Sequence, residues 1–122
     1  MMSGVILGKY PHLVSGAVLA STTNNVHEWS NYHGWGKWPN SLSPHDWVAK
    51  IPSDTFVYIV SGIRDKNTYP NMARTYYESL KKSKIPAYFI FSEEGSHNTI
   101  VLNKAKEFKL AIQKALKDCP AP

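Results

Sequence analysis

The stretch TFVYIVSGIRD, residues 55–65, decides the fold class of this chain. Residues 55–60 are all β-branched or aromatic, which is typical of a strand that is buried in a sheet. Ser61-Gly62 ends this apolar run, and the turn that follows carries Asp65. Two more short apolar runs, VSGAVLAS at 14–21 and AYFIF at 87–91, predict two further buried strands.

Helical patterns separate these strands. Residues 1–9 resemble a helix that ends before Tyr10-Pro11, and Ser43-Pro44 begins a short helix with Ser43 as its N-cap. Two longer segments have the apolar spacing of helices. The first, from Tyr69-Pro70 to Lys84, places Met72, Ala73, Tyr76, Tyr77 and Leu80 on one face, and the second, over 101–116, places Val101, Ala105, Phe108, Ile112 and Ala115 or Leu116 on one stripe.

The order helix, strand, loop, helix, strand, helix, strand, helix predicts parallel strands joined by right-handed crossovers. We therefore expect an α/β protein with about three parallel strands and helices on both faces of the sheet, which is a three-layer arrangement. The length of 122 residues fits a single domain over 1–122.

Composition narrows the class of protein. The chain is 43% hydrophobic and 19% charged, so it can bury a core. It contains no apolar run of the length that crosses a membrane, and no secretory signal pattern is visible near its first residue. Cys119 is the only cysteine, which excludes an internal disulfide and favours a reducing compartment. We therefore expect a cytoplasmic protein.

Residues 22–44 differ from the rest of the chain. Trp29, Trp35 and Trp38 lie among Asn, Ser, Gly and His residues without a clear period. Irregular segments of this length are uncommon in compact domains and are often functional. The pattern predicts a long Trp-rich loop that acts as a lid or an aromatic binding surface. Packing of the tryptophans against the core is the alternative.

The candidate chemistry lies where two predicted strands end. Asp65 follows the strand at 55–60, and His97 follows the strand at 87–91. In parallel sheets, functional residues gather beyond the carboxyl ends of the strands. A carboxylate there can accept the proton of one imidazole nitrogen and leave the other nitrogen as a general base. The alternatives are a turn residue for Asp65 and a polar residue before the last helix for His97.

Three segments resemble the C-terminal half of an α/β-hydrolase of the peptidase and esterase branches. VYIVSGIRDKNTYP is similar to the strand and loop that carry the acid, and AYFIFSEEGSHNT is similar to the last core strand and histidine loop. GKYPHLVSGAVLAS resembles the end of the helix after the nucleophile, followed by the next strand. The family's chain order is serine, acid, histidine, so the resemblance implies that Asp65 is the acid and His97 the base.

The nucleophile is where the chain departs from this family. No Gly-x-Ser-x-Gly elbow occurs in the sequence, and counting back from Pro11 places the elbow before Met1. Ser3 has no preceding strand, so it is a poor substitute. We therefore expect a truncated, catalytically incomplete hydrolase-like domain. The alternative is an active serine hydrolase for a small ester or peptide-like ligand, with the serine supplied by a missing upstream segment or a partner chain.

A metal site and a nucleic-acid-binding surface are two further alternatives. The candidate metal ligands are His27, Glu28, His33, His45 and Asp46. They lack the i, i+4 histidine spacing of a helical zinc site, so we expect no metal and no other cofactor. Nucleic-acid binding is the alternative from another class. The net charge of +5 would suit phosphates, and Tyr58 and Tyr88 on strands would suit base stacking. No signature of a nucleic-acid-binding module is present.

The strand at 14–20 suggests a partner. In the resembling fold one of its edges pairs with an earlier strand, and a bare edge is prone to association. We expect a homo-oligomer, most simply a dimer, in which two copies pair these edges antiparallel about a two-fold axis. The apolar residues of the helix at 1–9 are expected to enlarge that interface.

Overall fold

The computed structural model describes residues 2–28, 41–101 and 106–119. In chain order the elements are α1 (Met2–Lys9), β1 (Gly16–Ala20), a 3-10 turn η1 (Val26–Glu28), a longer 3-10 segment η2 (Pro44–Lys50), β2 (Phe56–Gly62), α2 (Pro70–Lys82), β3 (Ala87–Ser92) and α3 (Lys106–Asp118). Trp29, Trp35 and Trp38 lie outside the described residues, so the predicted role of the Trp-rich loop stays a prediction.

The three strands form one parallel sheet in the order β1-β2-β3. Tyr58 at the centre of β2 is aligned with Val18 on β1 and with Tyr88 on β3. Each crossover between neighbouring strands contains a helical segment, as expected for parallel pairs. The α/β class and the parallel pairing that the sequence predicted are confirmed.

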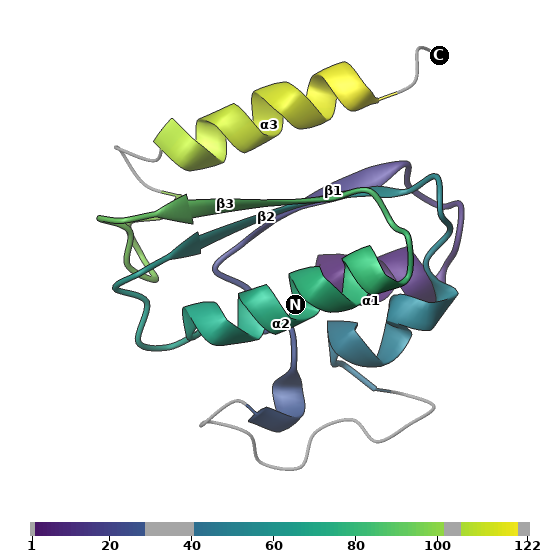
Figure 1. The fold of residues 1–122 in the computed structure, drawn as a ribbon, viewed down its shortest axis with the longest axis horizontal. Helices are drawn as coiled ribbons and strands as arrows, with labels where there is room; N and C mark the ends of the chain where they lie inside the picture. The colour runs from purple at the N-terminus through teal and green to yellow at the C-terminus, as the bar shows by residue number, and fades with distance from the viewer. Residues whose placement is uncertain (1, 29–40, 102–105, 120–122) are drawn as a thin grey trace.

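Helices cover both faces of the sheet (Figure 1). The layer of α1, η2 and α2 packs on one face, where Tyr76 and Leu80 of α2 are fully buried against Val57 and Ile59 of β2. The predicted apolar face of α2 is therefore confirmed. On the first helix, Gly4 and Gly8 allow close approach, because a Cβ at either position would overlap with Pro44 or Trp47 of η2. The predicted short helix at Ser43-Pro44 is this 3-10 segment, and the Ser43 hydroxyl accepts from Val26 N instead of capping it.

Helix α3 covers the other face, and its buried side matches the predicted stripe only in part. Ala111 is fully buried, with Phe108 and Ala115 packed beside it. Ile112 and Leu116 are 38% and 71% exposed. Val101 lies in a turn before the helix, and Ala105 lies outside the described residues.

The small side chain of Ala111 lets α3 lie close above Tyr58, which explains why Ala111 is buried in place of Ile112. The Tyr58 hydroxyl donates to Asp118 at 2.6 Å, and its ring stacks on Tyr88 at 4.5 Å between centroids. This bond ties the end of α3 to the centre of the sheet. Tyr58 is only 4% exposed, so it is not the base-stacking surface considered from the sequence.

No helix in the described ranges is both long and apolar enough to cross a membrane.

Candidate functional site

The loops after β2 and β3 meet at the carboxyl end of the sheet. Ile63 N donates to Ser92 O at 2.9 Å, and Arg64 N donates to Gly95 O at 2.9 Å. The contact requires a residue without a side chain at Gly62, because a Cβ there would overlap with the backbone of Gly95. Backbone hydrogen bonds thus hold the loop of the acid against the loop of the histidine.

Asp65 is buried and anchored by its own loop. Its Oδ1 accepts the backbone N–H groups of Asn67 at 2.9 Å and Thr68 at 2.8 Å, which is an Asx-type turn. Its Oδ2 accepts the Thr68 hydroxyl at 2.7 Å. The sequence pointed to Asp65 but missed Asn67 and Thr68, although a short polar stretch after an aspartate is itself a signal for such a turn.

These bonds favour the charged carboxylate. Burial alone would raise the pKa of Asp65, but hydrogen bonds from the Thr68 hydroxyl, the Thr68 and Asn67 amides and His97 together hold that pKa below its ordinary value. The side chain has no solvent exposure. A buried negative charge is therefore fixed beneath the histidine.

His97 lies directly on this carboxylate. Its Nδ1 is 3.1 Å from Asp65 Oδ2 and 3.3 Å from Thr68 Oγ1, and its Nε2 is 3.2 Å from Asn67 Nδ2. The expected contact between Asp65 and His97 is therefore present. The side chain of His97 is 36% exposed, so the ring joins the buried carboxylate to the surface.

The carboxylate decides where the ring carries its proton. An ionised carboxylate only accepts hydrogen bonds, so Nδ1 must donate its N–H to Asp65. In the neutral ring Nε2 then has a free electron pair. This is the tautomer in which Nε2 can act as a general base.

A small pocket borders His97 on the side of β1. It has a volume of about 370 Å³ and is lined by Ala20, Ser21, His97, Asn98, Ile100 and Val101. Ser21 follows β1 directly, has a left-handed backbone with φ 45°, and carries a buried hydroxyl with no hydrogen-bond partner. The sequence analysis placed Ser21 at the end of a strand but gave it no role.

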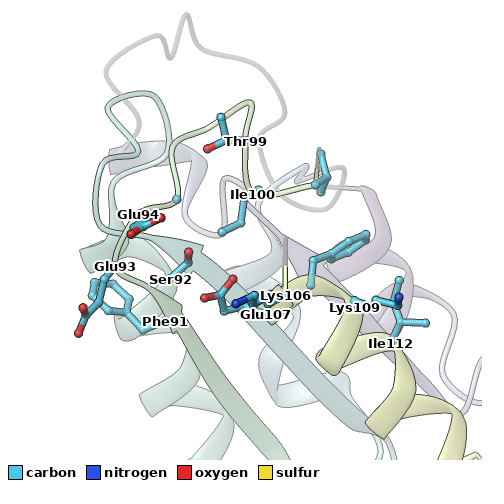
Figure 2. A pocket seen from close by; sticks show the side chains of 13 residues that line it. Phe91, Ser92, Glu93, Glu94, Thr99, Ile100, Lys106, Glu107, Lys109 and Ile112 are labelled. Carbon is cyan, nitrogen blue, oxygen red and sulfur yellow. The ribbon is translucent and has the colours of Figure 1, made fainter. Parts of the chain in front are cut away.

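A larger hollow of about 1250 Å³ lies between the end of β3, the loop after it and α3, and it shares Ile100 and Val101 with the small pocket (Figure 2). Figure 2 shows Phe91 and Ser92 from β3, Glu93 and Glu94 from the loop, and Lys109 from α3 around it. Asp65 and His97 do not line it. We therefore place the candidate site at the smaller pocket, where the oriented histidine is.

The second group of polar residues singled out from the sequence forms a different arrangement. His27 Nε2 is 3.2 Å from Asp46 Oδ2, and the Ser41 hydroxyl donates to the same oxygen. Within the ranges 2–28, 41–101 and 106–119 no group of three potential ligands surrounds a common point. His33 lies outside these ranges, and Nδ1 of His45 is buried without a hydrogen-bond partner within them.

The fold is shared with solved peptidases. An acylaminoacyl peptidase in complex with Z-Gly-Gly-Phe-chloromethyl ketone superposes with a TM-score of 0.74 at 16% identity, over 93% of this chain and 21% of its own. The acylaminoacyl peptidase of Pyrococcus horikoshii gives 0.76 at 13% identity, over 97% and 22%. Dipeptidyl peptidase 4 of Porphyromonas gingivalis gives 0.71 at 15% identity, over 94% and 17%.

No protein-family model matches the chain, and no curated protein matches it in sequence. The chain spans about a fifth of the length of the solved structures that it matches. Its parallel sheet and helices nevertheless superpose on these peptidases over nearly the whole of its own length. The chain therefore has the fold of part of an α/β-hydrolase domain.

Proposed function

We propose that this chain carries the acid and base of a Ser-Asp-His hydrolase site, with Asp65 as the acid and His97 as the base. One observation carries the proposal: a buried carboxylate, anchored by three donors of its own loop, holds the Nδ1 of a half-exposed histidine at 3.1 Å. The likeness in fold to solved peptidases supports the same assignment.

The geometry is suited to proton transfer from a hydroxyl. With Nδ1–H donated to Asp65, the Nε2 electron pair of His97 can take the proton of an attacking hydroxyl. The ring is then an imidazolium, and the fixed carboxylate of Asp65 stabilises its charge without accepting the proton. The imidazolium next returns the proton to the leaving group.

The described residues do not supply the attacking hydroxyl. Among them, Nε2 of His97 has a hydrogen bond from Asn67 and none from a serine or threonine. Ser3 lies exposed in α1, and the hydroxyl of Ser21 is buried. We propose that the chain alone is catalytically incomplete. In the alternative, a serine of another segment or partner reaches the pocket beside His97 and a small ester or peptide-like substrate binds there.

The proposal is tested by the tautomer of His97 and by its dependence on Asp65. The ¹⁵N shifts of the ring are measured in the full chain, in Asp65→Asn, and in Asp46→Asn as a matched control, because Asp46 also contacts a histidine. We expect the Nδ1–H tautomer in the parent and in Asp46→Asn, and its loss in Asp65→Asn. An unchanged tautomer in Asp65→Asn would overturn the assignment.

A fluorophosphonate probe tests whether the site is complete. We expect no serine adduct on the purified chain, because the described residues bring no hydroxyl to Nε2 of His97. An adduct that forms on the parent and disappears in His97→Ala would show that the chain supplies its own nucleophile. In that case the chain is an active serine hydrolase, and the proposal that it is catalytically incomplete is wrong.

We also propose that the chain self-associates through the free edge of β1. Within the described part of the chain, β1 pairs with β2 alone. Ser15 O and Ser21 N bond to β2, so the backbone groups of Val18 point to the other side by alternation. Leu13 and Val14, just before this edge, are 66% and 40% exposed. The contribution expected from the helix at 1–9 is smaller, since its Val5 and Leu7 are buried in the core of this chain.

A further inference from the structure

Both ring nitrogens of His97 are bound by one short segment. Asp65 holds Nδ1 at 3.1 Å, and the side-chain amide of Asn67 lies 3.2 Å from Nε2. The backbone of Asn67 is itself fixed, because its N–H donates to Asp65 Oδ1 at 2.9 Å. The turn that anchors the acid therefore also sets the position of the group that faces the base.

The direction of the second hydrogen bond follows from the first. Asp65 can only accept, so Nδ1 carries the proton, and Nε2 of the neutral ring is an acceptor. The atom of Asn67 that faces Nε2 must then be the donor Nδ2–H. The electron pair that would take a proton from a nucleophile is thus engaged by Asn67 in this structure.

We propose that Asn67 is a positioning residue that caps the base of the site, occupying Nε2 of His97 until a hydroxyl replaces it. This inference rests on the proposed function of the Asp65–His97 pair and adds a group that neither the sequence pattern nor the fold assigns. The cap holds the ring in place from the side opposite Asp65, and it lowers the reactivity of Nε2.

A side-chain amide suits this position because it can serve both charge states of the ring. It donates through Nδ2 to the neutral ring. When the ring is an imidazolium, rotation of the amide by about 180° presents Oδ1 as an acceptor for Nε2–H. An aspartate has only the second of these capacities, and an alanine has neither. The three side chains therefore predict three different outcomes.

Acylation by diethyl pyrocarbonate tests the cap, because this reagent attacks the free electron pair of a neutral imidazole. The rate at His97 is measured peptide by peptide in the full chain, with exposed His12 as the internal reference. Loss of a neutral hydrogen bond of ordinary strength predicts that Asn67→Ala raises the rate at His97 about two- to ten-fold. Asn67→Asp should lower it, since a carboxylate favours the protonated ring. Asn71→Ala, an exposed asparagine of α2 that lines neither pocket, is the matched control and should leave the rate unchanged.

The ¹⁵N shifts of His97 provide the second readout. In Asn67→Ala we expect the Nδ1–H tautomer to persist and Nε2 to move toward the shift of an unbonded acceptor. Unchanged rates and shifts in both Asn67 variants would overturn the cap. If Asp65→Asn still alters the tautomer in that case, the acid–base pair stands and only the cap fails. If no variant alters the ring, the proposed function fails with it. Asn67→Asp keeps the size of the side chain, so it reports on the cap even if Asn67→Ala loosens the loop.

Discussion

Replacement of Asp65 provides the sharpest test of how the site is built. Asp65→Ala removes the acceptor of every hydrogen bond that holds the turn, whereas Asp65→Asn retains Oδ1 for the two backbone amides. In the asparagine variant, the new NH₂ group faces the Thr68 hydroxyl and His97, in the place of Oδ2. The hydroxyl can accept from it, and the ring must then shift its proton to Nε2.

The size of each effect follows from burial. Thr68 is 5% exposed, so Asp65→Ala leaves its amide buried without an acceptor and leaves its hydroxyl only the more distant Nδ1 of His97, at 3.3 Å. Each buried unsatisfied donor costs about 1–3 kcal/mol, so one lost and one weakened bond give a loss of about 1–6 kcal/mol in the free energy of unfolding. The amide of Asn67 and the ring of His97 are half-exposed and can turn to water. For Asp65→Asn we expect about 1–2 kcal/mol, because the bonds remain but lose their charge.

Urea unfolding followed by circular dichroism measures both losses. The free energies of unfolding are compared with the same dependence on urea concentration for all variants. The expected result is a larger loss for the alanine variant than for the asparagine variant. Equal losses in the two variants, or a loss below about 0.5 kcal/mol in Asp65→Ala, would refute the reasoning. Asp65 would then be an ordinary surface turn residue rather than the anchor of the loop.

Four further results are expected. The pKa of Asp65 is lower in the folded protein than in the unfolded chain, so its contribution to stability is present above the titration of the unfolded carboxyl near pH 4 and is lost as pH falls through the folded pKa. The free energy of unfolding should therefore fall more steeply with acid in the parent than in Asp65→Asn. Gly62→Ala should lower the free energy of unfolding by about 1–3 kcal/mol, because the added methyl group meets the backbone of Gly95, and it should weaken the tautomer preference of His97. A variant as stable as the parent would contradict this close contact. Hydrolysis of a small activated ester should be no faster with the parent than with His97→Ala, and a rate that depends on His97 would show a complete site. Light scattering at micromolar concentration should give a mass above 13.7 kDa, and Val18→Pro should reduce it by removing an N–H from the free edge of β1; a parent of monomer mass excludes the dimer.

The sequence predicted the sheet well because strand identity depends on composition. Residues 55–60 are β-branched or aromatic throughout, and buried parallel strands need this. The buried side of α3 was predicted only in part, because a helical repeat gives spacing but does not choose between neighbouring apolar positions. Phe108 and Ala115 of the predicted stripe pack on the sheet, whereas the small Ala111 is buried in place of Ile112.

In the candidate site, too, some features followed from the sequence and others depend on local geometry. Parallel strands bring Asp65 and His97 to one edge whatever the side chains of their loops do, so the contact followed from the topology. The positions of Asn67 and Ser21 depend on turn geometry instead. Asn67 reaches Nε2 through an Asx turn, and Ser21 has a left-handed backbone. Backbone angles of this kind are set by local hydrogen bonds that leave little trace in a single sequence.

The acid–base pair depends on a smaller part of the sheet than a complete triad does. Asp65 and His97 belong to consecutive loops after β2 and β3, and backbone bonds such as that from Arg64 to Gly95 join those loops directly. In the α/β-hydrolase pattern the serine precedes the acid and the histidine in the chain, and among the described residues one edge of β1 is free. The geometry of the pair is therefore independent of whether that edge is paired. It follows that Val18→Pro, which acts on the proposed association edge, should leave the tautomer of His97 unchanged, whereas Asp65→Asn should change the tautomer and leave the mass in solution as it is in the parent.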